Sequence, residues 1–187
     1  SDHRYGALVV WCVNGQETEP QAIYCTPKLH YPFDKSIDGR RYKWPKFQTV
    51  AIYEKLDGSN ILNYSYADAN GKRYSTFKTR LTPVLKASKF GDFRALWEEV
   101  LQRYPELRRP AQVLSGEYAF SYELYGYRNP HLILYENALD AKFLFAVRQS
   151  TAAVCVPEKF REHPLVMPRK TFADNKEDLV KLYESLR

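Results

Sequence analysis

The chain contains stretches in which apolar and polar residues alternate, a pattern that predicts β-strands with one buried face. The clearest is Asn60–Ala67, where leucine and tyrosine side chains alternate with polar ones. The pair Asn70-Gly71 follows, and this pair favours a tight hairpin turn. It leads into a second strand-like stretch over Arg73–Arg80. The pattern therefore predicts a β-hairpin.

Other strands are expected where a short apolar or aromatic run lies between turn-forming residues. These runs are Ala7–Val13, Thr49–Lys55, Ala111–Phe120, His131–Glu136 and Lys142–Arg148. Between the first two, the stretch Gln16–Lys46 contains four prolines. It predicts an irregular segment that wraps the surface.

Two segments repeat their apolar residues every three or four positions, which is the spacing of one face of a helix. Asp92 is placed to cap a helix over Phe93–Tyr104, and Asp174 to cap another over Lys176–Leu186. Hairpins with a few separate helices predict an α+β fold with antiparallel sheets and flanking helices.

Composition narrows the class of protein. A chain of 187 residues suits one domain, or one domain and a short appendage. Its 44% hydrophobic and 27% charged residues exclude disorder as a description of the whole chain. No apolar run approaches the roughly eighteen residues of a membrane span, and the first residues lack the features of a secretory signal. We therefore expect a soluble intracellular protein with no membrane segment. The oligomeric state is left open.

Charge and cysteine usage add two expectations. The net charge is +6 and aromatic residues make up 15% of the chain, which suits nucleic-acid binding, although a tyrosine-rich core is the commoner reason for such a composition. The three cysteines lie far apart, and the four histidines are not at zinc-ligand spacing. Buried free thiols in a reducing compartment, the cytoplasm or the nucleus, are expected.

The segment with the clearest chemistry is Lys55-Leu56-Asp57-Gly58, at the end of a predicted strand. A lysine amine is a nucleophile once it has lost its proton. Asp57 and Gly58 form a turn that would hold Lys55 in place, so both are expected to be structural residues of the motif. A surface lysine beside a common turn is the plain alternative, because Lys-x-Asp-Gly occurs by chance in about one chain in twenty-five of this length.

Four elements in a fixed order make the sequence resemble the covalent nucleotidyltransferases, which comprise RNA ligases, DNA ligases and mRNA-capping enzymes. The elements are Glu54–Asn60, Phe77–Leu81, Leu114–Tyr118 and Leu139–Arg148. The chain is most similar to ATP-dependent RNA ligases, because Glu54 precedes the lysine and Asn60 follows the glycine by two positions. The resemblance implies a fold like that of the nucleotidyltransferase, or ligase adenylation, domain.

The resemblance also implies an enzyme of RNA repair that joins strands. Lys55 would take AMP from ATP, the AMP would pass to a 5′-phosphate end, and a 3′-hydroxyl would then displace it. The implied cofactors are ATP and Mg²⁺ or Mn²⁺, with metal ligands unknown, and the implied partners are RNA ends. The nucleotide-binding residues that the resemblance implies are Glu54, Asn60, Arg80, Glu117 and Phe145.

The sequence also departs from this family. Ala146 stands where many such ligases carry an aspartate. After Arg148 there is neither the Glu-Gly pair nor the Lys-x-Lys strand of the superfamily. We therefore expect residues 1–187 to be the truncated N-terminal portion of an adenylation domain, weakly active by itself. A DNA ligase, a GTP-dependent capping enzyme and a non-catalytic nucleic-acid-binding module on the same scaffold remain alternatives.

Overall fold

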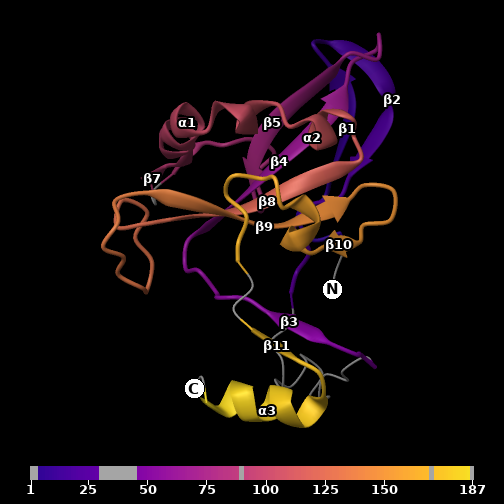
Figure 1. The fold of residues 1–187 in the computed structure, drawn as a ribbon. Helices are drawn as coiled ribbons and strands as arrows, with labels where there is room; N and C mark the ends of the chain where they lie inside the picture. The colour runs from indigo at the N-terminus through magenta and orange to yellow at the C-terminus, as the bar shows by residue number, and fades with distance from the viewer. Residues whose placement is uncertain (1–3, 30–45, 89–90, 169–170, 186–187) are drawn as a thin grey trace, which may run out of the picture. The chain divides into compact units, whose positions relative to one another are not determined.

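The computed structural model describes residues 4–29, 46–88, 91–168 and 171–185. The chain divides into two compact units, and each is described by itself (Figure 1). Unit 1 comprises Ser1–Lys28 and Leu56–Val166, and unit 2 comprises Leu29–Lys55 and Met167–Arg187. Residues 30–45, about half of the predicted irregular segment, lie outside the described residues.

Unit 1 is built on an antiparallel five-stranded sheet in the order β10-β9-β8-β4-β5. Its strands are β4 (Ser59–Ala67), β5 (Arg73–Thr79), β8 (Tyr118–Tyr125), β9 (Asp140–Arg148) and β10 (Val154–Cys155). The hairpin predicted around Asn70-Gly71 is confirmed, because β4 pairs antiparallel with β5 from Ile61↔Thr79 to Ala67↔Arg73. β4 also pairs with β8, so these two strands lie inside the sheet.

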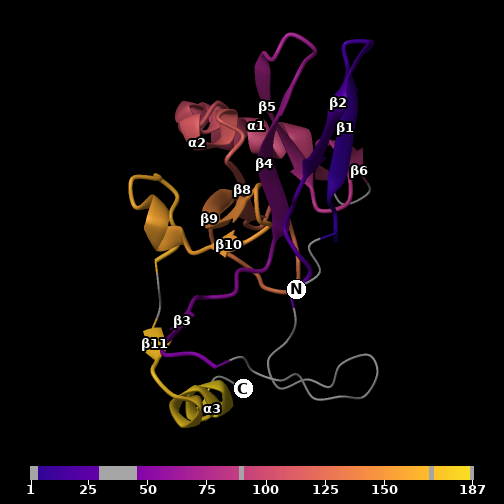
Figure 2. The same ribbon diagram turned by 90° about the vertical axis from the view of Figure 1, so that its right-hand side faces the viewer.

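Helices cover one face of this sheet, and a β-hairpin covers the other (Figures 1 and 2). The helical side consists of α1 (Phe93–Arg103), η1 (Pro105–Arg108) and α2 (Ala111–Leu114). As predicted, Asp92 caps α1, and its carboxylate accepts from the backbone N–H groups of Arg94 and Ala95. The larger core lies here and includes Trp97, Val100, Phe120, Tyr122 and Phe143. Short elements complete unit 1: β6 (Ala87–Ser88), β7 (Gly91–Asp92) and η2 (Pro157–Phe160).

On the other face lies the hairpin of β1 (Leu8–Val13) and β2 (Gln16–Ile23). Two glutamine side chains join this part of the chain to the sheet. The Gln21 amide donates to the Ala67 carbonyl at 2.9 Å and accepts from the Ala67 N–H at 2.7 Å. The Gln149 amide makes the same pair of bonds with the Tyr24 backbone, both at 2.9 Å. Each side-chain amide thus makes the two hydrogen bonds that the peptide groups of a neighbouring strand would make.

The prediction of an irregular segment from Gln16 onward is wrong over Gln16–Ile23, which forms strand β2. Asn14 and Gly15 have φ values of 53° and 79°, the left-handed conformation that a two-residue hairpin turn requires. Pro20 is tolerated because the strand pairing is irregular around it, and an irregular position needs no N–H donor from the proline.

Two further strand predictions are wrong. Ala111–Leu114 is helix α2, and β8 begins only at Tyr118, after a turn in which Gly116 has a φ of 79°. His131–Glu136 contains no strand and belongs to the connection between β8 and β9. Its apolar residues have no sheet to bury them, since Leu132 is 96% exposed and Leu134 is 88% exposed. The strand expected over Lys142–Arg148 is confirmed as β9.

Unit 2 contains β3 (Val50–Ile52), β11 (Thr171–Ala173) and α3 (Lys176–Ser185). β3 pairs antiparallel with β11, and this ladder ends at Ile52↔Thr171. The strand is therefore shorter than the predicted Thr49–Lys55.

The cap of α3 differs from the prediction. The side-chain oxygen of Asn175 accepts from the Asp178 N–H at 2.9 Å, which is the geometry of an N-cap. Asp174 instead accepts a hydrogen bond from the Thr49 hydroxyl at 3.2 Å. The helix thus begins at the predicted place with the neighbouring residue as its cap.

The thiols are all free, but only two of them are buried. Cys25 and Cys155 are buried, whereas Cys12 on β1 is exposed, which corrects the expectation that all three lie inside. No helix in the described part of the chain has both the length and the apolarity needed to cross a membrane.

Candidate functional site

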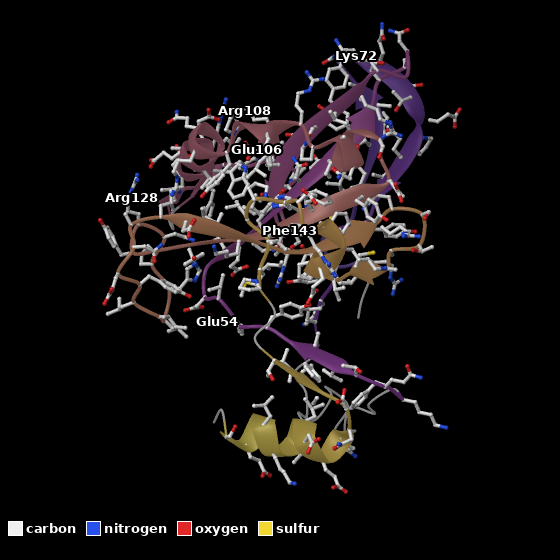
Figure 3. The ribbon with its side chains drawn as sticks, viewed as in Figure 1. Glu54, Lys72, Glu106, Arg108, Arg128 and Phe143 are labelled. Carbon is white, nitrogen blue, oxygen red and sulfur yellow. The ribbon has the colours of Figure 1, made fainter. Side chains whose placement is uncertain are left out.

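The motif Lys55-Leu56-Asp57-Gly58 lies in the segment that joins β3 to β4. Residues 53–57 have no regular secondary structure, so Lys55 lies in a connecting segment and not at the end of a strand as predicted. Glu54 (Figure 3) and Lys55 belong to unit 2, and Leu56 is the first residue of this part of unit 1.

Gly58 lies against β8 at the start of β4. A Cβ atom at this position would lie 2.2 Å from the carbonyl oxygen of Leu124, so a residue larger than glycine forces the backbone to move. The Gly58 N–H donates to Oε1 of Glu123 at 3.1 Å. This close approach holds the turn against β8 and brings a carboxylate to it.

Asp57 holds the β8–β9 connection with both its side chain and its backbone. Its Oδ2 atom accepts from the N–H groups of Leu132 and Ile133, at 2.7 and 2.9 Å. Its own N–H donates to the Tyr135 hydroxyl at 2.8 Å. The structural role expected for Asp57 thus rests on partners that lie more than seventy residues away in the sequence.

A β-bulge in β9 decides which aromatic side chain faces which side of the sheet. The pairing passes from Tyr122↔Phe143 to Ser121↔Phe145, so Leu144 is an extra residue. Phe143, which is labelled in Figure 3, belongs to the larger core together with Tyr122. Residues paired across two strands share a face, and neighbours along a strand alternate. Phe145, paired with Ser121, therefore lies on the face opposite Phe143.

The same register places Asn60 and Glu123 on the face of Phe145. Asn60 is paired with Glu123 across β4 and β8. The Asn60 Nδ2 atom donates to the Ser121 hydroxyl at 2.9 Å and to the Tyr122 carbonyl at 3.0 Å. We call the side of the sheet that carries Asn60, Ser121, Glu123 and Phe145 the Asn60 face.

The side-chain amide of Asn60 is held from both ends. Its oxygen accepts from the Thr26 hydroxyl at 2.8 Å, and that hydroxyl also contacts the Ser121 hydroxyl at 3.0 Å. Thr26 and Ser121 are both buried. The orientation of Asn60 is thus fixed by the protein before any ligand arrives, which lowers the cost of ordering a binding site.

Arg80 lies beside the Asn60 face. It follows β5 directly, and Thr79 is paired with Ile61, the neighbour of Asn60. Its side chain is exposed, and its guanidinium carbon lies 5.7 Å from the ring centroid of Tyr5.

Glu117 lies at the other end of β8. Its neighbour Tyr118 is paired with Arg148, whereas the Gly58 end of the strand is marked by Ser59↔Leu124. At about 3.3 Å per residue, Glu117 is about 20 Å along the strand from the turn. The structure therefore brings Asn60, Arg80 and Phe145 to one region of unit 1 and leaves Glu117 outside it.

Glu123 is the residue that sequence reasoning missed. It is the only charged residue between Tyr118 and Tyr127, a run that is otherwise apolar or aromatic apart from Ser121 and Gly126. A lone carboxylate in such a strand has to find a partner or a function, because burial of a charge is costly. That signal was available in the sequence, but its contact with Gly58 was not.

A neutral histidine supports the core behind the Asn60 face. Nδ1 of His163 accepts from the Leu165 N–H at 3.1 Å, so Nε2 carries the proton and donates to the Tyr122 hydroxyl at 3.0 Å. Its ring stacks on Phe143, with 4.5 Å between centroids. Burial lowers the pKa of His163 to about 4, so it is uncharged near neutral pH.

The described residues do not form a metal site of their own. No three His, Cys, Asp or Glu side chains among them come together in a group that would hold an ion. We therefore assign no metal ligand among these residues.

Comparison with known proteins identifies the fold. The sequence matches no model of a protein family and no curated protein. The solved structures that the chain matches include two described as an archaeal ATP-dependent RNA ligase, form 2 and form 1. Form 2 aligns with a TM-score of 0.58 and 15% identity, over 97% of this chain and 45% of the ligase. Form 1 aligns with a TM-score of 0.56 and 16% identity, over 97% of this chain and 52% of the ligase.

The chain thus spans about half the length of these ligases. At this level of identity, the likeness establishes the fold. It confirms the predicted class, α+β with antiparallel sheets and flanking helices, and this chain has a fold like that of RNA ligase adenylation domains.

Proposed function

We propose that this protein is an ATP-dependent RNA ligase that works through a covalent lysyl-AMP intermediate on Lys55. The observation that carries the proposal is the Asn60 face. Asn60, Glu123 and Phe145 share one side of the sheet. The turn that follows Lys55 in the sequence is hydrogen-bonded to Glu123. The likeness of the fold to RNA ligases supports the same conclusion.

Each side chain has a role in the proposal that matches its chemistry. The ring of Phe145 supplies a flat surface on which adenine stacks. The Glu123 carboxylate accepts from the ribose hydroxyls, a role that we give to it and not to Glu117 because only Glu123 lies at the turn. Arg80 offers a guanidinium fork to sugar or phosphate oxygens. Asn60 and Glu54 complete the proposed nucleotide contacts.

The first step is the displacement of pyrophosphate. The Lys55 amine, after losing a proton, attacks the α-phosphorus of ATP, so that a nitrogen–phosphorus bond forms and the bond to the pyrophosphate oxygen breaks. An oxygen of the 5′-phosphate of an RNA end then attacks the phosphorus of the AMP, so that a phosphoanhydride bond forms and the nitrogen–phosphorus bond to Lys55 breaks. A 3′-hydroxyl displaces the AMP and seals the strand. Mg²⁺ or Mn²⁺ would accompany ATP and neutralise its phosphates, since such ions are commonly held by substrate phosphates.

We propose a reducing compartment of the cell as the location of the protein. All three cysteines are unpaired, which suits a reducing compartment inside the cell.

Since the chain spans about half of the matched ligases, strand joining is proposed for the full-length protein.

The test is an intact mass measurement after incubation with ATP or GTP and Mg²⁺, on this chain and on the full-length protein. We expect a gain of one AMP that Lys55→Ala abolishes. Lys181→Ala, an exposed lysine of unit 2, is the matched control and should keep the adduct. A GMP gain would indicate a capping enzyme. A separate assay with nicked RNA and nicked DNA tests the DNA-ligase alternative, which preferential sealing of DNA would indicate. A full-length protein without any adduct would contradict the proposal and favour a binding module.

A further inference from the structure

Two cationic side chains gather over one aromatic ring beside the Asn60 face. Nζ of Lys28 lies 5.9 Å from the ring centroid of Tyr5, and the guanidinium carbon of Arg80 lies 5.7 Å from it. Each contact with the ring is attractive, but the two like charges repel each other. Both side chains are exposed, and within the described ranges neither forms an ion pair with a carboxylate. Among the residues that the structure describes, no carboxylate therefore compensates the positive charge at this place.

The backbone that carries these groups is closely held. Lys78 is 2% exposed, and its Nζ donates to the carbonyl oxygens of Gly6 and Arg80, both at 3.0 Å. A Cβ atom on Gly6 would lie 2.4 Å from the Arg80 oxygen, so the two segments touch. The buried lysine thus ties the turn that contains Tyr5 to the residue that carries the guanidinium.

Both cations are also close in the chain to residues that contact Asn60 or its neighbour. Lys28 follows by two positions Thr26, whose hydroxyl donates to Asn60. Arg80 follows Thr79, which is paired with Ile61. The two charges therefore lie beside the Asn60 face, near the β5 edge of the sheet.

We propose that Tyr5, Lys28 and Arg80 form a clasp that binds a phosphate group of the polynucleotide strand, with Tyr5 positioning the two cations. The inference rests on the proposed function, because a ligase must hold a strand. It goes beyond that function because Tyr5 and Lys28 lie outside all four sequence elements of the resemblance. A bound phosphate neutralises positive charge at this place, and its oxygens match a guanidinium fork.

The test measures strand binding without ATP. Binding of a labelled, 5′-phosphorylated single-stranded RNA is followed by fluorescence anisotropy over a series of salt concentrations. Lys28→Ala should weaken binding about three- to tenfold and lower the slope of log K against log salt by about 0.7, the value for one phosphate contact on a single strand. Tyr5→Leu should weaken binding about two- to fivefold without removing a charge, whereas Tyr5→Phe keeps the ring and should bind as wild type does.

Lys72→Ala is the matched control. Lys72 lies over the ring of Tyr74 at 5.4 Å, near the turn of the β4–β5 hairpin, so its removal deletes the same charge and the same kind of contact elsewhere (Figure 3). Its slope should equal that of the wild type. Equal slope changes for Lys28→Ala and Lys72→Ala would overturn the clasp, and so would wild-type binding by Tyr5→Leu.

A second RNA with a 5′-hydroxyl end identifies which phosphate is bound. A loss by Lys28→Ala confined to the phosphorylated strand assigns the terminal phosphate, and an equal loss on both strands assigns an internal one; either result supports the clasp. Failure of the proposed function has a separate signature. It is seen as a missing AMP adduct on Lys55, which the binding experiment does not require.

Discussion

The backbone N–H of Gly58 donates to the carboxylate of Glu123 at 3.1 Å, although the two residues lie 65 positions apart in the sequence. This contact joins the turn after Lys55 to the middle of the sheet. It also selects Glu123, among the acidic residues of β8 and its flanks, as the one at the candidate site.

Substitution of Glu123 should affect both the turn and the chemistry. Glu123→Ala removes the acceptor for Gly58 and should lower the free energy of unfolding by about 1–3 kcal/mol. Glu123→Gln keeps an acceptor oxygen but loses the charge, so it should leave stability near that of the wild type and slow lysine adenylylation about 10- to 100-fold. The measurements are urea unfolding and the rate of AMP adduct formation by mass. Glu117→Ala is the comparison. If it slows adenylylation more than Glu123→Gln does, Glu117 and not Glu123 contacts the ribose.

Asp57 should control the order of the β8–β9 connection. Asp57→Ala removes the acceptor for the Leu132 and Ile133 N–H groups, so hydrogen exchange at these two amides should become faster. Asp57→Asn keeps one acceptor oxygen and should have a smaller effect. Site-resolved hydrogen exchange measures this directly. Unchanged exchange in Asp57→Ala would show that other contacts hold the connection.

Substitution of the two phenylalanines on opposite faces of β9 should affect different properties, namely stability for Phe143 and ATP binding for Phe145. Phe143→Ala should cost about 3–5 kcal/mol of unfolding free energy, because Phe143 is fully buried in the core. Phe145→Ala should cost less stability but weaken ATP binding about 5- to 100-fold through the lost stacking. Urea unfolding and titration with ATP distinguish the two. Equal ATP binding by Phe145→Ala and wild type would remove Phe145 from the proposed site.

Stability should fall between neutral and acidic pH because of His163. The pKa of His163 is about 4 in the folded chain and about 6.5 when unfolded, so between these values only the unfolded chain binds the proton. The free energy of unfolding should therefore decrease as pH falls from about 6.5 to 4, by up to about 3 kcal/mol in total.

The variant His163→Phe isolates this effect, since it removes the titrating group and other acidic groups cancel in the difference from wild type. His131→Gln is the control, because His131 is exposed and lies outside the core. Denaturant unfolding at several pH values provides the measurement. A wild-type pH dependence that persists in His163→Phe would assign it to another group.

The local patterns of the sequence determined much of the fold. Strict alternation and Asn70-Gly71 predicted the β4–β5 hairpin, and Asp92 before a helical repeat predicted α1, because both depend on residues within one or two turns of chain. The order of four short elements was enough to indicate the fold class. Local patterns gave the wrong prediction at Gln16–Ile23. The prolines of the longer stretch Gln16–Lys46 predicted an irregular segment, whereas the Asn14-Gly15 turn leads into a strand.

The tertiary structure decided what depends on pairing between distant strands. Alternation alone places Phe143 and Phe145 on one face, and only the bulge at Leu144, visible once β9 is paired with β8, separates them. The partners of Asp57 and Gly58 likewise lie in β8 and in the connection after it. The sequence by itself indicated Lys55-Leu56-Asp57-Gly58 as the candidate motif. Only the register of the sheet determined which carboxylate contacts its turn and which ring shares the face of Asn60, because a shift of one residue moves a side chain to the other side.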